Sequence, residues 1–211
     1  MASTSARLLL LAALLGLLKW TQHMTFTGLR GQRAATISLS PRHLKTLDAL
    51  ARKKGCTAAN AVGLFFATQT GNTEEVAGMI GSATGLGASD YDGEDFSDLD
   101  GMIVGCPTWN TGADDMRSGT TWDDYLETIA GYDLKGKTVA IFGCGDSQGY
   151  GDNFCDGIEE LHNTFQAAGA KMVGYSDADG YDFSESKSVK DGKFLGLPLD
   201  QDNEGDQSES R

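Results

Sequence analysis

Short apolar runs recur along the chain after residue 60, and each has the length of a buried strand. Three of them are nearly free of polar residues: Val62–Phe66 (VGLFF), Gly101–Gly105 (GMIVG) and Thr138–Gly143 (TVAIFG). A fourth run is Lys171–Tyr175 (KMVGY), and Phe194–Leu199 (FLGLPL) is its expected continuation. Runs of this length predict strands.

Amphipathic stretches lie between these runs and predict helices. The first covers Thr73–Ala83, with Val76, Met79 and Ile80 on one face. A second centres on Trp122, Tyr125, Leu126 and Ile129, and a third helix is expected over Asn153–Ala168.

Strands that alternate with helices predict the α/β class, with a parallel, doubly wound sheet in a three-layer α/β/α arrangement. Ligands bind such sheets at the carboxyl ends of the strands. The candidate binding loops are therefore those that begin near Ala67, Cys106 and Cys144.

Charge divides the chain into two segments. The 211 residues carry a formal charge of −13, from 17 Lys/Arg and 30 Asp/Glu. Residues 1–60 hold nine of the cations and one acid, Asp48, which leaves 8 cations and 29 acids for residues 61–211. The segments carry +8 and −21. We expect residues 61–211 to be one domain and residues 1–60 to be a separate, largely disordered leader.

The leader has the composition of a targeting segment. Arg7 precedes Leu8–Leu18, eleven apolar residues that are too few to span a bilayer but suit a signal-peptide core. Residues 19–60 are rich in Arg, Lys, Ser and Thr, as transit peptides are. The combination resembles the bipartite presequences of algae with complex plastids, so we expect the plastid stroma. A secretory signal followed by a spacer is the alternative.

Composition also narrows the class of function. Strong acidity argues against nucleic-acid binding and favours basic partners, although it can equally serve solubility. Outside the leader the cysteines are Cys106, Cys144 and Cys155, an odd number at irregular spacing. This is neither a disulfide framework nor a zinc site, and the three thiols are better interpreted as packing residues. We expect a monomer without membrane contact once the leader is removed.

One phosphate-binding pattern lacks the required context. Gly131–Thr138 (GYDLKGKT) matches the P-loop pattern G-x-x-x-x-G-K-[ST]. A P-loop follows a strand and opens a helix, whereas this match precedes the strand TVAIFG. We interpret it as an exposed turn.

The stretch that follows Val62–Phe66 has the right context. It leaves a strand and enters a helix whose first N–H groups lack partners. Hydroxyl and amide side chains surround one glycine, and the loop contains no lysine or arginine; its residues are Thr68, Gln69, Thr70, Gly71, Asn72 and Thr73. Neutral donors without a P-loop lysine favour a phosphomonoester. A polar N-cap without a ligand is the alternative.

Two aromatic residues in the other loops favour a ligand site over a polar N-cap without a ligand. Trp109 lies in the loop after Gly101–Gly105, and Tyr150 lies between two glycines in the loop after Thr138–Gly143. Aromatic side chains on neighbouring loops can hold a flat ring by stacking. A phosphate loop with two such aromatics describes a site for flavin mononucleotide (FMN).

Four ordered motifs then resemble the long-chain flavodoxins, most closely those of algae. They are FFATQTGNTEEVA, VGCPTWNTGADD, FGCGDSQGYGDNFCDGIEEL and GYDFSESKSVKDGKFLGLPLD, and they span about residues 61–205. The resemblance implies a flavodoxin-like fold, with residues 175–192 as an insertion that splits the last strand. It also implies that Thr68–Thr73 hold the FMN phosphate, and that Trp109 and Tyr150 flank the ring. Two loops would embrace the ring: Pro107, Thr108, Trp109, Asn110, Thr111 and Gly112, and Cys144, Gly145, Asp146, Tyr150, Asp152, Asn153 and Phe154.

The function implied by the resemblance is electron transfer rather than catalysis. The protein would be a low-potential one-electron carrier that replaces ferredoxin in plastids, between photosystem I and ferredoxin–NADP reductase. Asp146 and Asp152 would disfavour added negative charge on the ring, and a carbonyl of the Asn110–Thr111 peptide would accept the flavin N5 proton. The alternatives are a flavodoxin-like NAD(P)H or quinone oxidoreductase and a flavin-free binding module.

The sequence departs from the family in two places. The second strand of the family has only a short counterpart, expected around Leu86–Tyr91. Family members also continue into a final helix, whereas here an acidic tail after Leu199 reaches Arg211 and is expected to be flexible. We therefore expect either a fragment of a longer chain or a protein that holds FMN weakly.

Overall fold

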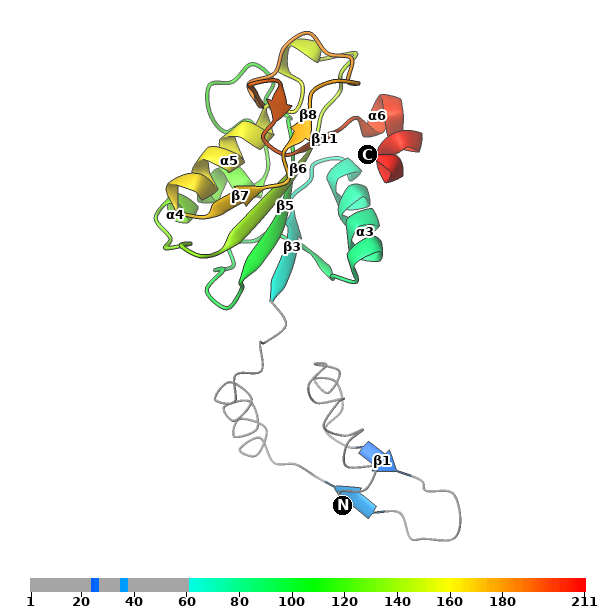
Figure 1. Cartoon of the computed structure of the whole chain (residues 1–211), viewed down its shortest axis with the longest axis vertical. Helices are drawn as coiled ribbons and strands as arrows, with labels where there is room; N and C mark the ends of the chain where they lie inside the picture. The colour runs from blue at the N-terminus through cyan, green and yellow to red at the C-terminus, as the bar shows by residue number, and fades with distance from the viewer. Residues whose placement is uncertain (1–23, 27–34, 38–60) are drawn as a thin grey trace. The chain divides into compact units, whose positions relative to one another are not determined.

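The computed structural model describes residues 24–26, 35–37 and 61–211 (Figure 1). Strands β1 (Met24–Phe26) and β2 (Ala35–Ile37) pair antiparallel with each other. The predicted signal core Leu8–Leu18 lies outside the described residues, as does the remainder of residues 1–60 apart from β1 and β2, so the targeting role of residues 1–60 stays a prediction. In the described ranges, no helix has the length and apolar character that crossing a membrane requires.

A parallel sheet organises residues 61–211, as predicted. Its strands run in the order β4–β3–β5–β6–β11. They are β3 (Val62–Phe66), β4 (Ala88–Asp90), β5 (Gly101–Pro107), β6 (Thr138–Cys144) and β11 (Leu197–Leu199). β5 and β6 each extend beyond the predicted run, so Cys106, Pro107 and Cys144 end strands rather than begin loops.

The edge of the sheet next to β6 is made by two strands. β7 (Lys171–Val173) pairs with Thr138–Ala140, and β11 pairs with Phe142–Cys144 of the same strand. Between them the chain leaves the sheet and forms a small antiparallel sheet from β8 (Ser176–Asp177), β9 (Val189–Lys190) and β10 (Lys193–Phe194). The expected continuation of the fourth strand is therefore confirmed for Leu197–Leu199, whereas Phe194, at the start of the expected run, belongs to β10 of the small sheet.

Helices cover both faces of the sheet (Figure 1). α3 (Asn72–Thr84) packs on one face against Leu64, Phe66 and Phe142, while α4 (Thr121–Ala130) and α5 (Gly157–Ala167) lie on the other. α5 begins four residues later than predicted. A short 3-10 turn, η1 (Gly151–Asn153), precedes it, and Cys155 has a φ of 56°, outside the helical region.

Aromatic side chains fill the core on the α4 side. Trp122 is fully buried, stacks on Tyr91 with ring centroids 4.0 Å apart, and donates Nε1–H to the Gly105 carbonyl oxygen at 2.8 Å. Tyr91 also stacks on Phe96, and both lie on the connection from β4 to β5, residues 91–100, which contains no helix. Buried aromatics here take the place of a helix.

The two expected departures have different outcomes. β4 spans only three residues, within the predicted Leu86–Tyr91. The acidic tail, expected to be flexible, instead forms α6 (Gln201–Glu204) and a 3-10 turn, η2 (Gly205–Ser210). Asp200 caps α6 by accepting a hydrogen bond from Asn203 N–H at 3.0 Å. This local capping supplies order that hydrophobic periodicity does not signal.

Trp122→Phe is expected to destabilise the fold by about 2 kcal/mol, because it removes a buried hydrogen bond and part of a fully packed ring. Chemical denaturation of the flavin-free chain measures this change. Trp109→Phe is the matched control, since Trp109 is 56% exposed, and should change the free energy of unfolding by less than about 0.5 kcal/mol. Equal effects of the two substitutions would contradict the packing described here.

His162 makes the stability depend on pH. It is buried on α5 next to the Tyr175 hydroxyl (Nε2 to Oη, 3.1 Å), and burial lowers its pKa despite the nearby Glu159. The unfolded chain therefore takes up the proton first, and stability decreases as pH falls from about 7 through the unfolded value of about 6.5 to the folded pKa. We expect His162→Gln to flatten this dependence in denaturation at pH 5 and 7. An unchanged difference between the two pH values would refute the assignment.

Candidate functional site

The site lies where the strand order reverses. β3 lies between β4, the next strand in the sequence, and β5. The β3–β5 pairing runs from Val62 opposite Gly101 to Phe66 opposite Gly105. The loops after β3 and β5 therefore leave the same edge of the sheet, and this is the position at which doubly wound sheets bind ligands. The loops lie at the carboxyl ends of the strands, as predicted, and their role as a binding site stays a prediction.

The loop after β3 has the features of an anion site. Gly71 has a φ of 102°, with open space where a Cβ would lie, and its N–H donates to Thr68 Oγ1 at 3.0 Å. Thr73, in the first turn of α3, is fully buried. Its Oγ1 lies beside the Cys144 thiol, whose pKa it lowers against the larger effect of burial, and it has no oxygen or nitrogen partner within residues 61–211. A buried hydroxyl without a partner is costly, so its presence beside the unpaired N–H groups of a helix start indicates a ligand oxygen.

The two amide side chains of this loop have other partners. Gln69 donates Nε2–H to the Gly119 carbonyl oxygen, on the loop that carries Trp109. Asn72 donates Nδ2–H to Asp202 Oδ1 at 3.0 Å, on α6. In this structure they tie the loop to its neighbours, and the exposed Thr70 joins Thr68 and Thr73 as a hydroxyl available to a ligand.

Trp109 lies in the loop after β5 with 56% of its side chain exposed. Gly119 packs closely behind it, because a Cβ there would lie 2.7 Å from that of Trp109. Asn110, Thr111, Gly112 and Ala113 form a turn in which Ala113 N–H donates to the Asn110 carbonyl at 3.2 Å. Gly112 has a φ of 77°, as the third residue of a type II turn requires.

Hydrogen bonds to helix α5 hold the Trp109 loop in place. Glu160 accepts the backbone N–H groups of Met116 and Arg117, each at 2.7 Å, and burial raises the pKa of its carboxyl. The buried Arg117 side chain donates to Glu159 at 2.7 Å and to the Asp156 carbonyl at 3.0 Å. Sequence reasoning missed these residues, because charged side chains on a helix are ordinarily solvated.

Tyr150 occupies the corresponding place after β6, also 56% exposed. Its loop is shaped by Asp146, whose Oδ1 accepts N–H groups of Gln148 at 3.0 Å and Gly149 at 2.7 Å. These bonds, Gly149 foremost, lower the pKa of the Asp146 carboxyl. The carboxylate therefore holds a turn that presents Tyr150 to solvent.

Other predicted residues differ in what they offer a ligand. Asp152 is exposed, Thr108 Oγ1 accepts the Gly157 N–H at 2.9 Å, and Asn153 Nδ2 contacts Asp156 at 3.4 Å. The side chains of Cys144 and Phe154 point into the core, where Phe154 stacks on Phe183. Gly145 and Pro107 are half-buried at the strand ends. Cys144 and Phe154 can therefore reach a ligand only through their backbone.

The three thiols are packing residues, as expected. Cys106, Cys144 and Cys155 are buried and unpaired. Burial raises the pKa of all three, that of Cys144 to about 12. Thiols that stay protonated are poor nucleophiles.

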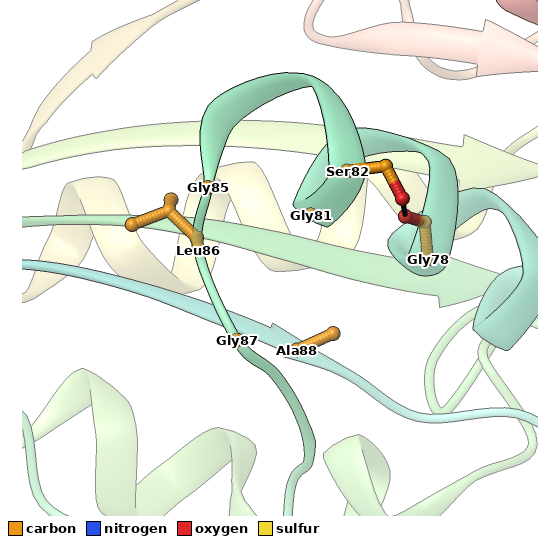
Figure 2. Close-up of a pocket in the computed structure, with 7 residues that line it drawn as sticks. All are labelled: Gly78, Gly81, Ser82, Gly85, Leu86, Gly87 and Ala88. Atoms are coloured by element: carbon orange, nitrogen blue, oxygen red, sulfur yellow. Dashed lines mark hydrogen bonds between the residues drawn. The ribbon is translucent and has the colours of Figure 1, made fainter.

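Two other features carry no chemistry. The P-loop match Gly131–Thr138 joins α4 to β6, as its context predicts. A groove of about 570 Å³ lies beside the C-terminal half of α3, away from its N-terminus (Figure 2). Its lining contains four glycines, and the Ser82 hydroxyl is already bonded to the Gly78 carbonyl at 2.8 Å, so it offers a ligand little polar contact.

Together, the loops fit a flat ring attached to a phosphate. Hydroxyl groups and helix N–H groups converge at Thr68–Thr73 and would take the phosphate, while two exposed aromatics on the adjoining loops would take the ring. The fit rests on neutral donors, since Arg117 is committed to Glu159 and carbonyl groups.

Comparisons with known proteins agree with this geometry. The family model described as flavodoxin matches residues 64–210. A flavodoxin of Synechocystis is 43% identical over 157 residues, which cover 71% of this chain and 90% of that protein. A flavodoxin of Nostoc is 42% identical over 156 residues, with 71% and 89% covered.

A solved structure gives the same result at the level of the fold. The crystal structure of a Fusobacterium nucleatum flavodoxin bound to flavin mononucleotide superposes with a TM-score of 0.64 at 27% identity. The alignment covers 72% of this chain and 91% of that one. The family match over residues 64–210 and the identity to relatives over almost their whole length show that this chain belongs to the flavodoxin family.

Proposed function

We propose that the protein is a one-electron carrier that binds FMN non-covalently between the loops after β3, β5 and β6. The observation that carries this function is the buried Thr73 hydroxyl at the start of α3, which has no oxygen or nitrogen partner within residues 61–211. It lies in a loop tied to the one that exposes Trp109. A phosphate and an attached ring would satisfy both features together.

The residues of the chain would bind and orient the cofactor, which supplies the redox chemistry when bound. Thr68, Thr70 and Thr73 would donate to the phosphate together with the first N–H groups of α3. Trp109 and Tyr150 would cover the ring and exclude water. None of these groups needs to act as an acid, a base or a nucleophile, which favours electron transfer over catalysis.

Carboxylates around the ring loops would tune the potential. Asp114 and Asp115 are exposed on the Trp109 loop, and Asp152 is exposed beside Tyr150. Negative charge near the ring disfavours the addition of an electron, which lowers the reduction potential. The −21 charge of residues 61–211 adds a longer-range effect of the same sign.

We further propose a flavodoxin type, a cellular location and redox partners for this protein. The edge strand split into β7 and β11, with an inserted small sheet between them, supports the long-chain type. The composition of residues 1–60 supports delivery to a plastid, where the protein would replace ferredoxin. Its acidity supports docking to the basic surfaces of photosystem I and ferredoxin–NADP reductase.

We expect Thr73→Val to weaken FMN binding by about tenfold, because a charge-assisted hydrogen bond is lost. Riboflavin binding should not change, since riboflavin lacks the phosphate. The same substitution should leave the flavin-free chain at least as stable, because it removes a buried unpartnered hydroxyl. Fluorescence titration with both flavins and denaturation of the flavin-free chain measure the three quantities. Equal weakening of the two flavins would show that Thr73 does not contact the phosphate.

A second test uses the full chain loaded with FMN. We expect a potentiometric titration to resolve two one-electron steps, the second at the lower potential, and no NADPH oxidation without added reductase. NADPH oxidation by the protein alone would favour the oxidoreductase alternative. A chain that takes up no FMN, monitored by flavin absorbance after removal of free cofactor, would instead indicate a flavin-free binding module.

A further inference from the structure

Helix α6 lies between two of the cofactor loops. It has only four residues, Gln201–Glu204, yet its side chains reach segments far away in the sequence. Asp202 contacts residue 72, and Asn203 contacts residue 146. A tail turn whose role was only to cap itself would not need either contact.

The first contact holds the phosphate loop. Asp202 Oδ1 accepts Asn72 Nδ2–H at 3.0 Å, and Asn72 is the first residue of α3. A carboxylate beside a loop that receives a phosphate repels the ligand. Its placement there is understandable if the contact fixes the loop, and the amide of Asn72 is thereby directed away from the ligand.

The second contact holds the loop that presents Tyr150. Asn203 Nδ2 donates to Asp146 Oδ1 at 2.9 Å, the same oxygen that accepts the Gln148 and Gly149 N–H groups. Asp200, which is buried, adds a bond from Ser147 N–H at 2.9 Å and accepts Asn203 Nδ2 as well. The turn that precedes Tyr150 is therefore held at two of its residues, Asp146 by Asn203 of α6 and Ser147 by the cap residue Asp200.

We propose that α6 is a clamp that positions the phosphate loop relative to the Tyr150 loop, with Asp202 and Asn203 as the positioning residues. The inference deepens the proposed function and rests on it. The hydrogen bond from Gln69 to Gly119 in turn joins the phosphate loop to the Trp109 loop.

The Asp202 contact is tested by two substitutions at the same position in the full chain. Asp202→Asn removes the charge but keeps an oxygen that can accept from Asn72, whereas Asp202→Ala removes both. We expect FMN to bind the Asn variant at least as tightly as the wild type, and the Ala variant about fivefold more weakly than the Asn variant. Riboflavin should bind all three alike.

A matched charge control lies in the same tail. Asp206 is exposed on η2, and no hydrogen bond joins its side chain to another of residues 61–211. Asp206→Asn changes the net charge as Asp202→Asn does, so any difference between them reports position. We expect Asp206→Asn to leave the affinity for both flavins unchanged. Equal FMN affinity of the Asp202→Ala and Asp202→Asn variants would overturn the role of Asp202.

The Asn203 contact predicts a different pattern. Asn203→Ala keeps the backbone N–H that bonds Asp200 and so keeps the cap of α6. It should weaken FMN and riboflavin alike, by about tenfold, because the ring loop is loosened. In the flavin-free chain, hydrogen exchange at Gln148 and Gly149 should become faster. The amide of Lys187, which bonds Asp156 at 2.7 Å, should be unaffected.

The outcomes distinguish failure of the α6 clamp from failure of the proposed FMN binding. A wild-type chain that binds neither flavin overturns the proposed function and this inference with it. If the wild type binds both flavins but Asn203→Ala changes neither the flavin affinities nor the hydrogen exchange at Gln148 and Gly149, the inference alone is overturned. Faster exchange at Gln148, Gly149 and Lys187 together would reveal general unfolding and would likewise overturn a specific clamp.

Discussion

The carbonyl oxygen of Gly105 joins the sheet, the phosphate loop and helix α4. It accepts the Ala67 N–H at 3.1 Å, which carries the β3–β5 pairing into the first residue after β3, and the Trp122 Nε1–H at 2.8 Å. A Cβ at residue 105 would lie 2.0 Å from the Phe142 ring, so any larger residue there would require this buried ring to move. The Gly105 carbonyl thus fixes both the point at which the phosphate loop leaves the sheet and the position of α4 against the sheet. The Trp109 loop, which runs between β5 and α4, is held at both ends as a result.

The sheet and the choice of loops were predictable because they depend on local pattern. Val62–Phe66 and Thr138–Gly143 are apolar enough to be buried strands, and the order of strands and helices dictates which loops share an edge. The same logic dismissed the P-loop match at Gly131–Thr138. Trp109 and Tyr150 could be singled out because an aromatic residue in a polar loop at the end of a strand is poorly placed to join a core, and Tyr150 in addition lies between two glycines.

What the sequence did not reveal depends on contacts between distant residues. Asn72 and Asp202 are 130 positions apart, and no local pattern distinguishes a carboxylate that fastens a loop from one that faces water. Gln69 and Asn72 were predicted as phosphate donors from their chemistry, yet their amides are already bonded to Gly119 and Asp202. The late start of α5 has a similar cause, because the φ of 56° at Cys155 lies in a segment whose sequence is otherwise compatible with a helix.

The proposed site would bind an anion within a strongly acidic domain, and this explains why the loop contacts matter. Thr68–Thr73 contain no cation, and Arg117 is occupied by Glu159 and by the Asp156 carbonyl. Long-range electrostatics oppose the phosphate, so affinity has to come from neutral donors at short distance. Such donors act only when their geometry is fixed, because a hydroxyl or an N–H displaced by 1 Å no longer makes a hydrogen bond. A site that used lysine could tolerate a mobile loop, whereas the proposed site would require Gln69, Asn72 and α6 to hold the loop in place before the ligand arrives.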